Sequence, residues 1–129
     1  MRVTIIGIIL LLLTDMHFSR GDIILIPFPF TDQTDSKPRP AVVISNSSVN
    51  KTRDIILAQI TSSLHNDEFS FTINDNQVTK SLQQHCEIRC HKVFTAEKYL
   101  VKGKISKFKP EEYEKVFAKI VSFLQADTN

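Results

Sequence analysis

The sequence predicts a mainly β protein, with a small curled sheet closed by a C-terminal α-helix. Short segments rich in β-branched residues and separated by polar stretches fill residues 22–93, whereas residues 110–124 carry apolar side chains at helical spacing. No internal repeat or interdomain linker is visible. With 129 residues, of which 42% are hydrophobic, the chain can bury one core but not two of ordinary size.

The first predicted strand covers residues 22–30, where apolar side chains alternate with two prolines. Its apolar face carries Ile24, Ile26, Phe28 and Phe30. Because Pro27 and Pro29 cannot donate to a ladder, we expect an edge strand or a strand end. Phe28 and Phe30 could stack on nucleic-acid bases, but their spacing alongside the two isoleucines favours packing in the core. The polar residues 31–37 are expected to form a loop.

Two further strands are predicted at residues 40–45 and 54–61, joined by the polar segment 46–53. Weaker strand signals lie at residues 69–73 and 86–93. A helix is expected from Pro110, because proline suits the first helical position and Glu111 and Glu112 suit the positive end of the helix dipole. Its predicted buried stripe consists of Tyr113, Val116, Phe117, Ile120, Val121 and Leu124.

The net charge and the cysteine content exclude few classes of function. The net charge of +2 and a pI of 8.6 permit an anionic partner without requiring one. Cys86 and Cys90 would lie about 13 Å apart on a strand, too far for a disulfide, and a reducing cytoplasm suits them better. The same spacing argues against a zinc site built with His85 and His91. We therefore expect no metal, two core thiols and two histidines at the rim.

The N-terminus carries an apolar run at residues 3–13, which is shorter than the roughly 18 to 20 residues that span a bilayer. No small-residue cleavage signal follows it. We interpret residues 1–15 as an extension from a start codon called too early, and residues 16–129 as one domain. A signal peptide or anchor, or a genuine extra strand or helix, are the alternatives, and no membrane association is expected unless this run is genuine.

Two clusters could carry chemistry. Arg39 stands between Pro38 and Pro40, which hold it extended, and its guanidinium suits a phosphate; an ordinary surface arginine in a turn is the alternative. Three hydroxyl residues, Thr61 to Ser63, end the third strand and could reach phosphate oxygens or cap a local turn. His65, four residues after Thr61, could take part in acid–base chemistry, although four scattered histidines are unspecific.

Together these segments resemble the MazF/PemK toxin family in order and spacing. The resemblance is carried by RGDIILIPFPFTD at residues 20–32, KPRPAVVIS at 37–45 and AQITS at 58–62, and more loosely by KVFT at 92–95 and KIS at 104–106. It covers nearly everything after Met16. One departure is Cys86, which stands where relatives often have a serine and leaves any substrate contact from that strand in doubt.

The resemblance implies an SH3-like barrel of the MazF/PemK/CcdB toxin type that forms a homodimer. It implies the toxin component of a type II toxin–antitoxin system, neutralised by a cognate antitoxin protein and active in the cytoplasm. The implied activity is sequence-specific cleavage of single-stranded RNA without metal or other cofactor. In this chemistry the ribose 2′-OH attacks phosphorus and leaves a 2′,3′-cyclic phosphate and a 5′-OH.

By the same resemblance Arg39 and Thr61 match the catalytic residues, and Gln33, Ser36, Lys37 and Ser62 are candidates for RNA binding. Because a guanidinium stays protonated to above about pH 12, charge stabilisation is a safer role for Arg39 than proton transfer. Two alternatives stay open. Toxins that bind gyrase share this fold without cutting RNA, and an inactive relative could keep only RNA or antitoxin binding.

Overall fold

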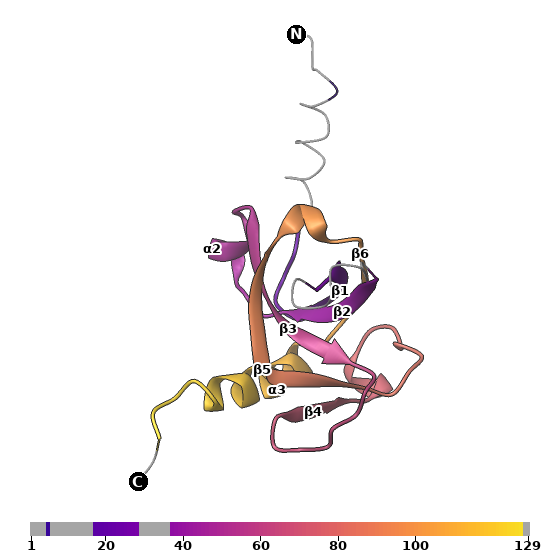
Figure 1. The fold of residues 1–129 in the computed structure, drawn as a ribbon, viewed down its shortest axis with the longest axis vertical. Coiled ribbons are helices and arrows are strands. Elements are labelled where there is room, and N and C mark those ends of the chain that lie inside the picture. The colour runs from indigo at the N-terminus through magenta and orange to yellow at the C-terminus, as the bar shows by residue number, and fades with distance from the viewer. Residues whose placement is uncertain (1–4, 6–16, 29–36, 128–129) are drawn as a thin grey trace.

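The short β-branched segments pair into a six-stranded antiparallel sheet in the order β4-β5-β3-β2-β1-β6 (Figure 1). This is a computed structural model that describes residue 5, residues 17–28 and residues 37–127. The strands are β1 (Asp22–Pro27), β2 (Pro38–Val43), β3 (Asp54–Thr61), β4 (Ser70–Ile73), β5 (Cys86–Glu97) and β6 (Gly103–Lys107). The helices are α2 (Ser47–Asn50) and α3 (Pro110–Ser122), with 3-10 turns η1 (Asp75–Gln77) and η2 (Lys98–Leu100). The predicted mainly β architecture with a C-terminal helix is confirmed.

Side chains alternate across the sheet, so each face has its own apolar cluster. One cluster lies between the sheet and α3; its sheet residues include Ile23, Val42, Ala58, Ile60 and Ile88. The other lies inside the curl of the sheet and includes Ile24, Ile26, Phe28, Ala41, Val43, Ile55 and Leu57. Burial of each large aliphatic side chain contributes roughly 1.5–3 kcal/mol. The two clusters together fix which residues of each strand face which side.

The strand predictions differ from the structure mainly at element ends and at the sheet margin. Strand β3 has the predicted bounds, whereas β2 begins two residues earlier and β5 continues four residues further. Strand β1 is not at an edge, because it pairs with both β2 and β6. Pro27 is the last residue of β1, so the predicted alternative, a strand end, is confirmed. The pairing of β1 with β6 already ends at Leu25. Strand β6 and helix α2 were not predicted, since both are short and polar.

Strand β5 is long because it serves both halves of the curled sheet. Near its C-terminal end it pairs with the start of β3, and near its N-terminal end it lies between the end of β3 and β4. Its register against β3 shifts at one point: Ala58 pairs with Val93, but the next residue of β3, Gln59, pairs with Arg89. A bulge of this kind bends a strand and increases its twist, which lets the sheet curl (Figure 1).

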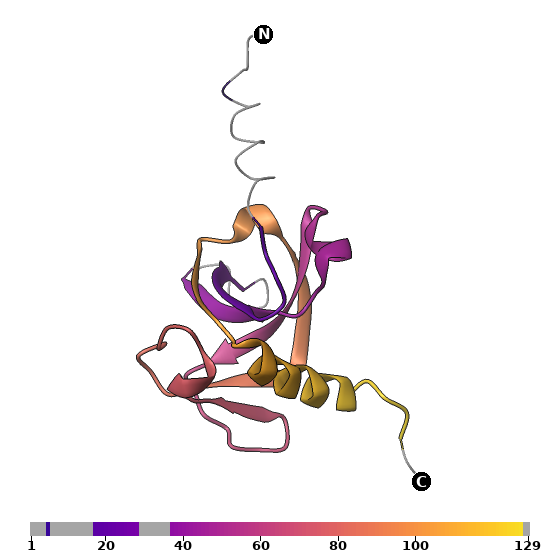
Figure 2. The same ribbon diagram turned by 180° about the vertical axis from the view of Figure 1, so that it is seen from behind.

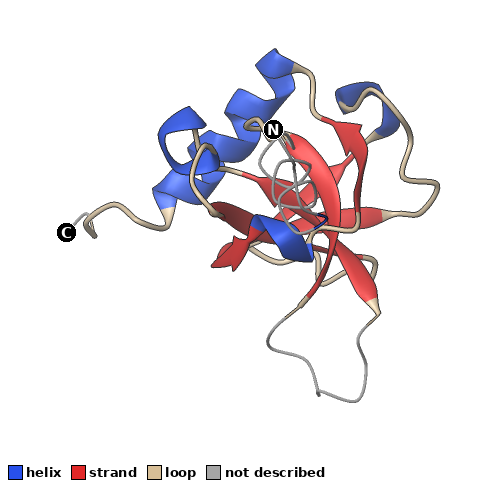
Figure 3. Cartoon of the chain, turned by 90° about the horizontal axis from the view of Figure 1, so that it is seen from above, coloured by secondary structure: helices blue, strands red, loops and turns tan. Residues whose placement is uncertain are grey.

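Helix α3 begins at Pro110 as predicted, with Glu111 and Glu112 in its first turn. It packs along one side of the sheet (Figures 2 and 3) and buries Tyr113, Val116 and Ile120. Two residues of the predicted stripe are exposed. Phe117 contacts the guanidinium of Arg20, whose Cζ lies 4.8 Å from the ring centre, and stacks on Tyr113 with ring centres 6.3 Å apart. Leu124 follows the last helical residue, so helical spacing no longer applies to it.

Two predictions about the N-terminal part concern residues outside the description. Of residues 1–15 the structure describes only Ile5, and Phe30 lies in the undescribed range 29–36. Phe28 is buried and packs edge-on against Phe94, with ring centres 5.4 Å apart, as the core interpretation predicted. Within the described residues, no helix has the length and apolar character needed to cross a membrane.

A buried polar network around Asn50 joins four segments of the chain. The Asn50 side-chain amide donates to the carbonyl oxygens of Phe18, at 3.2 Å, and Ser45, at 2.7 Å. Its carbonyl oxygen accepts from the Ser45 hydroxyl, which itself accepts from the Ile56 N–H at 2.9 Å. The Lys98 ammonium donates to the Asn50 backbone carbonyl at 2.7 Å. The network therefore connects the N-terminal segment, α2, β3 and η2.

Replacing Asn50 with alanine is expected to lower the free energy of unfolding by about 2–3 kcal/mol, because it leaves buried partners unsatisfied. Urea denaturation followed by circular dichroism measures the change. Asn76→Ala is the matched control; this asparagine is exposed, and a change below about 0.5 kcal/mol is expected. Equal urea midpoints for Asn50→Ala and the wild type would show that the network does not stabilise the fold.

Candidate active site

The register of β2 against β3 brings Arg39 and Thr61 to facing positions. Ala41 pairs with Gln59, and the strands run in opposite directions. The ladder ends at this pair, and the same register extended by two residues would align Arg39 with Thr61. Because every second residue of a strand shares a face, Arg39, Gln59 and Thr61 lie on the face of Ala41, inside the curl of the sheet. They extend this face beyond the apolar cluster, where the polar ends of both strands meet solvent.

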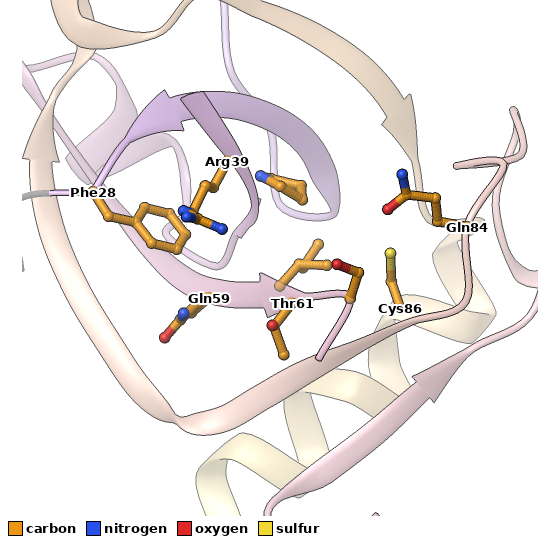
Figure 4. A pocket seen from close by; sticks show the side chains of 9 residues that line it. Phe28, Arg39, Gln59, Thr61, Gln84 and Cys86 are labelled. Carbon is orange, nitrogen blue, oxygen red and sulfur yellow. The ribbon is translucent and has the colours of Figure 1, made fainter. Parts of the chain in front are cut away.

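These side chains surround a hollow of about 150 Å³ (Figure 4). We call it the arginine hollow; it is lined by Phe28, Arg39, Pro40, Gln59, Ile60, Thr61, Ser62, Gln84 and Cys86. Among these described lining residues Arg39 is the only one with a charged side chain. It is smaller than the roughly 300–1,000 Å³ of pockets that enclose whole small molecules. Its size and the guanidinium of Arg39 suit a phosphate group together with a small part of the molecule that carries the phosphate.

Arg39 is held on an extended backbone, as its two proline neighbours predicted. Pro38 and Pro40 both belong to β2, and Arg39 pairs with Ile26 of β1. Its side chain is exposed at the mouth of the curl. A backbone held in place in this way lowers the entropy that the guanidinium loses when it binds an anion.

The hydroxyl of Thr61 has a defined orientation. Its Oγ1 accepts a hydrogen bond of 3.0 Å from the backbone N–H of Ser63. This is the local turn contact that the hydroxyl run allowed, and it does not use the hydroxyl proton. An oxygen that accepts from the backbone can still donate its own O–H. Thr61 can therefore donate to an anion in the arginine hollow while the turn fixes its position.

Glu87 lies opposite Thr61 on the other side of β3 and anchors the loop that follows Thr61. It is fully buried. Its Oε1 accepts from the backbone N–H groups of His65, at 2.9 Å, and Asn66, at 3.2 Å. Its Oε2 accepts from the Ser70 hydroxyl at 2.6 Å and from Arg89 at 2.7 Å. The carboxylate thus ties the loop to β4 and β5.

Arg89 completes this network by binding a second carboxylate. Its guanidinium nitrogens donate to the two oxygens of Asp67 at 2.8 and 3.0 Å. The hydrogen bond from Arg89 holds the pKa of Asp67 well below its usual range. Desolvation raises the pKa of Glu87, but hydrogen bonds, from Ser70 and Arg89 first, outweigh it and lower the pKa from 4.5 to about 2. Both carboxylates are ionised at neutral pH.

Of the other predicted site residues that the structure describes, only Ser62 lines the arginine hollow. Lys37 is exposed next to the start of β2 and is not among the lining residues. Gln33 and Ser36 lie outside the described residues. His65 contributes its backbone N–H to Glu87, and its side chain does not line the hollow.

Six lining residues were not predicted as site residues: Phe28, Pro40, Gln59, Ile60, Gln84 and Cys86. Gln59 could have been found from its place two residues before Thr61 on the same strand face. Gln84 carried no signal, because its position depends on the path of the loop between β4 and β5. Phe28, predicted as core, is buried in the core and also forms one wall of the hollow.

Cys86 also lines the arginine hollow, so the departure from the family pattern is at the site itself. Burial raises the pKa of its thiol, which is therefore protonated at neutral pH. Cys86 and Cys90 are free and buried, and His85 and His91 are exposed, as the core and rim interpretations predicted. Within the described part of the chain, no group of three or more potential ligands is placed to hold a metal ion.

Comparison with known proteins shows what the chain is similar to. The family model for the PemK-like, MazF-like toxin of type II toxin-antitoxin system matches residues 19–124. MazF (Form-I) from Deinococcus radiodurans is 18% identical with a TM-score of 0.68, and the match covers 85% of this chain and 98% of that one. A structure described as an endoribonuclease in complex with its cognate antitoxin from Mycobacterial species is 12% identical, with a TM-score of 0.68 and coverages of 87% and 99%.

The toxin MazF-mt6 of Mycobacterium tuberculosis is 15% identical with a TM-score of 0.65, and the match covers 83% of this chain and 99% of that one. No curated protein matches the chain. At these identities the solved structures establish the fold. The predicted fold class, the SH3-like barrel of the MazF type with a C-terminal helix, is confirmed.

The Glu87 network predicts a stability that depends on pH. A carboxylate with a lowered folded-state pKa stabilises the protein above its unfolded-state pKa, and this contribution is lost as pH falls from about 4.5 towards 2. Glu87→Gln is expected to lower the free energy of unfolding by about 3 kcal/mol at pH 7, because Arg89 loses a buried partner. The difference from the wild type should shrink between pH 5 and pH 3 in urea titrations.

Glu111→Gln, which changes an exposed carboxylate of α3, is the control and should show no such convergence. A constant difference between Glu87→Gln and the wild type across this pH range would contradict the assignment.

Proposed function

The chain belongs to the PemK-like, MazF-like toxins of type II toxin–antitoxin systems, and we propose that it is an endoribonuclease that cleaves single-stranded RNA at a short sequence without a metal ion. One observation carries this proposal. Arg39 and Thr61, from the neighbouring strands β2 and β3, line the same hollow. A guanidinium and a hydroxyl donor that line one small space suit the oxygens of one phosphate.

The reaction we propose is transfer of phosphorus from the 5′-oxygen to the neighbouring 2′-oxygen. The 2′-oxygen forms a bond to phosphorus, the bond to the 5′-oxygen breaks, and a proton passes overall from the 2′-OH to the leaving 5′-oxygen. The products are a 2′,3′-cyclic phosphate and a 5′-OH. Negative charge builds on the non-bridging oxygens, where Arg39 supplies positive charge and Thr61 supplies a hydrogen bond.

The RNA strand requires contacts beyond the scissile phosphate. Ser62 lies beside Thr61 in the arginine hollow and can donate to the same or the next phosphate. Lys37 is exposed one residue before β2, where an ammonium attracts the RNA backbone. Gln33 and Ser36 are proposed for RNA binding from the family resemblance alone.

Two protein partners belong to the proposal. Solved structures with this fold include complexes described as MazE-MazF from Deinococcus radiodurans, and we propose that a cognate antitoxin likewise neutralises this chain. We also propose a homodimer. A ribonuclease controlled by an antitoxin must reach cellular RNA, so we expect it to act in the cytoplasm.

Arg39→Ala and Thr61→Ala are each expected to lower the rate of RNA cleavage by about 10²- to 10³-fold, because each removes a donor to the developing charge. Thr61→Ser keeps the hydroxyl and should retain most activity. Arg53→Ala and Thr95→Ala are matched controls, since both residues are exposed and lie at the other end of the β3 and β5 ladder. Cleavage is measured on purified RNA in EDTA.

The products distinguish the proposed chemistry from the alternatives. Mapping of RNA 5′ ends should show 5′-OH groups at a repeated short sequence. Full activity of folded Arg39→Ala protein would remove the assignment of Arg39. If RNA stays intact and gyrase supercoiling is inhibited instead, the gyrase-binding alternative replaces this proposal.

A further inference from the structure

A second hollow adjoins the arginine hollow. It measures about 440 Å³, and its polar lining residues are Asn74, Asp75, Ser81, Gln83, Gln84 and His85. We call it the aspartate hollow. Gln84 lines both hollows, and the next residues diverge: His85 lines the aspartate hollow and Cys86 the arginine hollow. The two spaces are therefore neighbours along the short segment that leads into β5, where Figure 4 labels Gln84 and Cys86.

The walls of the aspartate hollow are held by hydrogen bonds within the segment between β4 and β5. The Ser81 hydroxyl donates to Asp75 Oδ1 at 2.9 Å and accepts from the Gln83 N–H at 3.1 Å. Asp75 begins η1, whose preceding residue Asn74 accepts from the Gln77 N–H at 3.0 Å through its backbone carbonyl. Among the described residues, nothing donates a hydrogen bond to Asp75 Oδ2, so this oxygen can accept from a ligand.

The two hollows differ in charge. The described residues that line the first include the guanidinium of Arg39, whereas those that line the second include one carboxylate, several amides and neither lysine nor arginine. A carboxylate repels phosphate. It accepts hydrogen bonds from the N–H groups of a nucleobase, and amides complement the remaining polar edge. A volume of about 440 Å³ lies within the range of pockets that enclose a small molecule.

We propose that the aspartate hollow binds the base of a nucleotide adjacent to the scissile phosphate, and that Asp75 selects a base with hydrogen-bond donors on its Watson–Crick edge. This inference rests on the proposed ribonuclease function. Guanine fits best, because its N1–H and N2 amino group present two neighbouring donors to one carboxylate. Uracil fits worst, because two carbonyl oxygens flank its single N–H. The exposed ring of His85 offers a surface on which the base can stack.

The test compares cleavage sites of wild type and Asp75→Asn on one long RNA, mapped by 5′-OH ends. The wild type should prefer guanine at one fixed position near the cut, and Asp75→Asn should reduce that preference by roughly 10- to 100-fold. The asparagine keeps the size of the side chain and can still accept from Ser81. Glu68→Gln makes the same charge change at an exposed carboxylate outside the hollow and should leave the preference unchanged.

A binding measurement separates this inference from the proposed function. Oligonucleotides with a 2′-deoxyribose at the cut site cannot react, so their affinities report recognition alone. The wild type should bind the guanine-containing oligonucleotide more tightly than its uracil counterpart, and Asp75→Asn should lose the difference. If the wild type cleaves RNA and Arg39→Ala does not, but Asp75→Asn keeps the wild-type base preference, this inference is wrong and the function stands. If the wild type neither cleaves nor binds RNA, both fail.

Discussion

The pairing of β2 with β3 is the constraint on which the proposed site depends. Ala41 lies opposite Gln59, and two residues beyond this pair Arg39 and Thr61 line the same hollow. A slip of one residue would turn every side chain of a strand to the other face, and the apolar clusters on both faces resist it. Core packing therefore places the two polar strand ends, although neither Arg39 nor Thr61 belongs to the core.

On the opposite side of β3 the buried network of Glu87, Arg89 and Asp67 gives the site a second support. Buried charges are costly unless they are paired and fully hydrogen-bonded, and here the loop after Thr61 supplies backbone N–H groups to Glu87. Within the described residues, one buried atom of the network, Arg89 Nε, has no hydrogen-bond partner. The strand end at Thr61 thus lies between an exposed guanidinium on β2 and an anchored carboxylate on β5.

The two adjacent hollows have the complementary charges that a nucleotide requires. In the proposal, the space beside Arg39 binds a phosphate and the space beside Asp75 binds a base, which are two chemically different parts of one substrate. In this proposal the reaction takes place at strand ends held by the sheet. The proposed base preference depends on the segment between β4 and β5, a connecting segment outside the strands that carry the core.

The sequence by itself determined what depends on near neighbours: the apolar face of β1, the start of α3 at Pro110, and an extended Arg39 between two prolines. Family resemblance added the proposed role of Thr61. Only the tertiary structure decided the pairing of β1 with β6, the exposure of Phe117 and Leu124, the Glu87 network and the meeting of Gln84 and Asp75 with the site. These features arise from contacts between segments that are far apart in the sequence. Strand register and loop path decide which side chains meet there, and neither can be read from local periodicity.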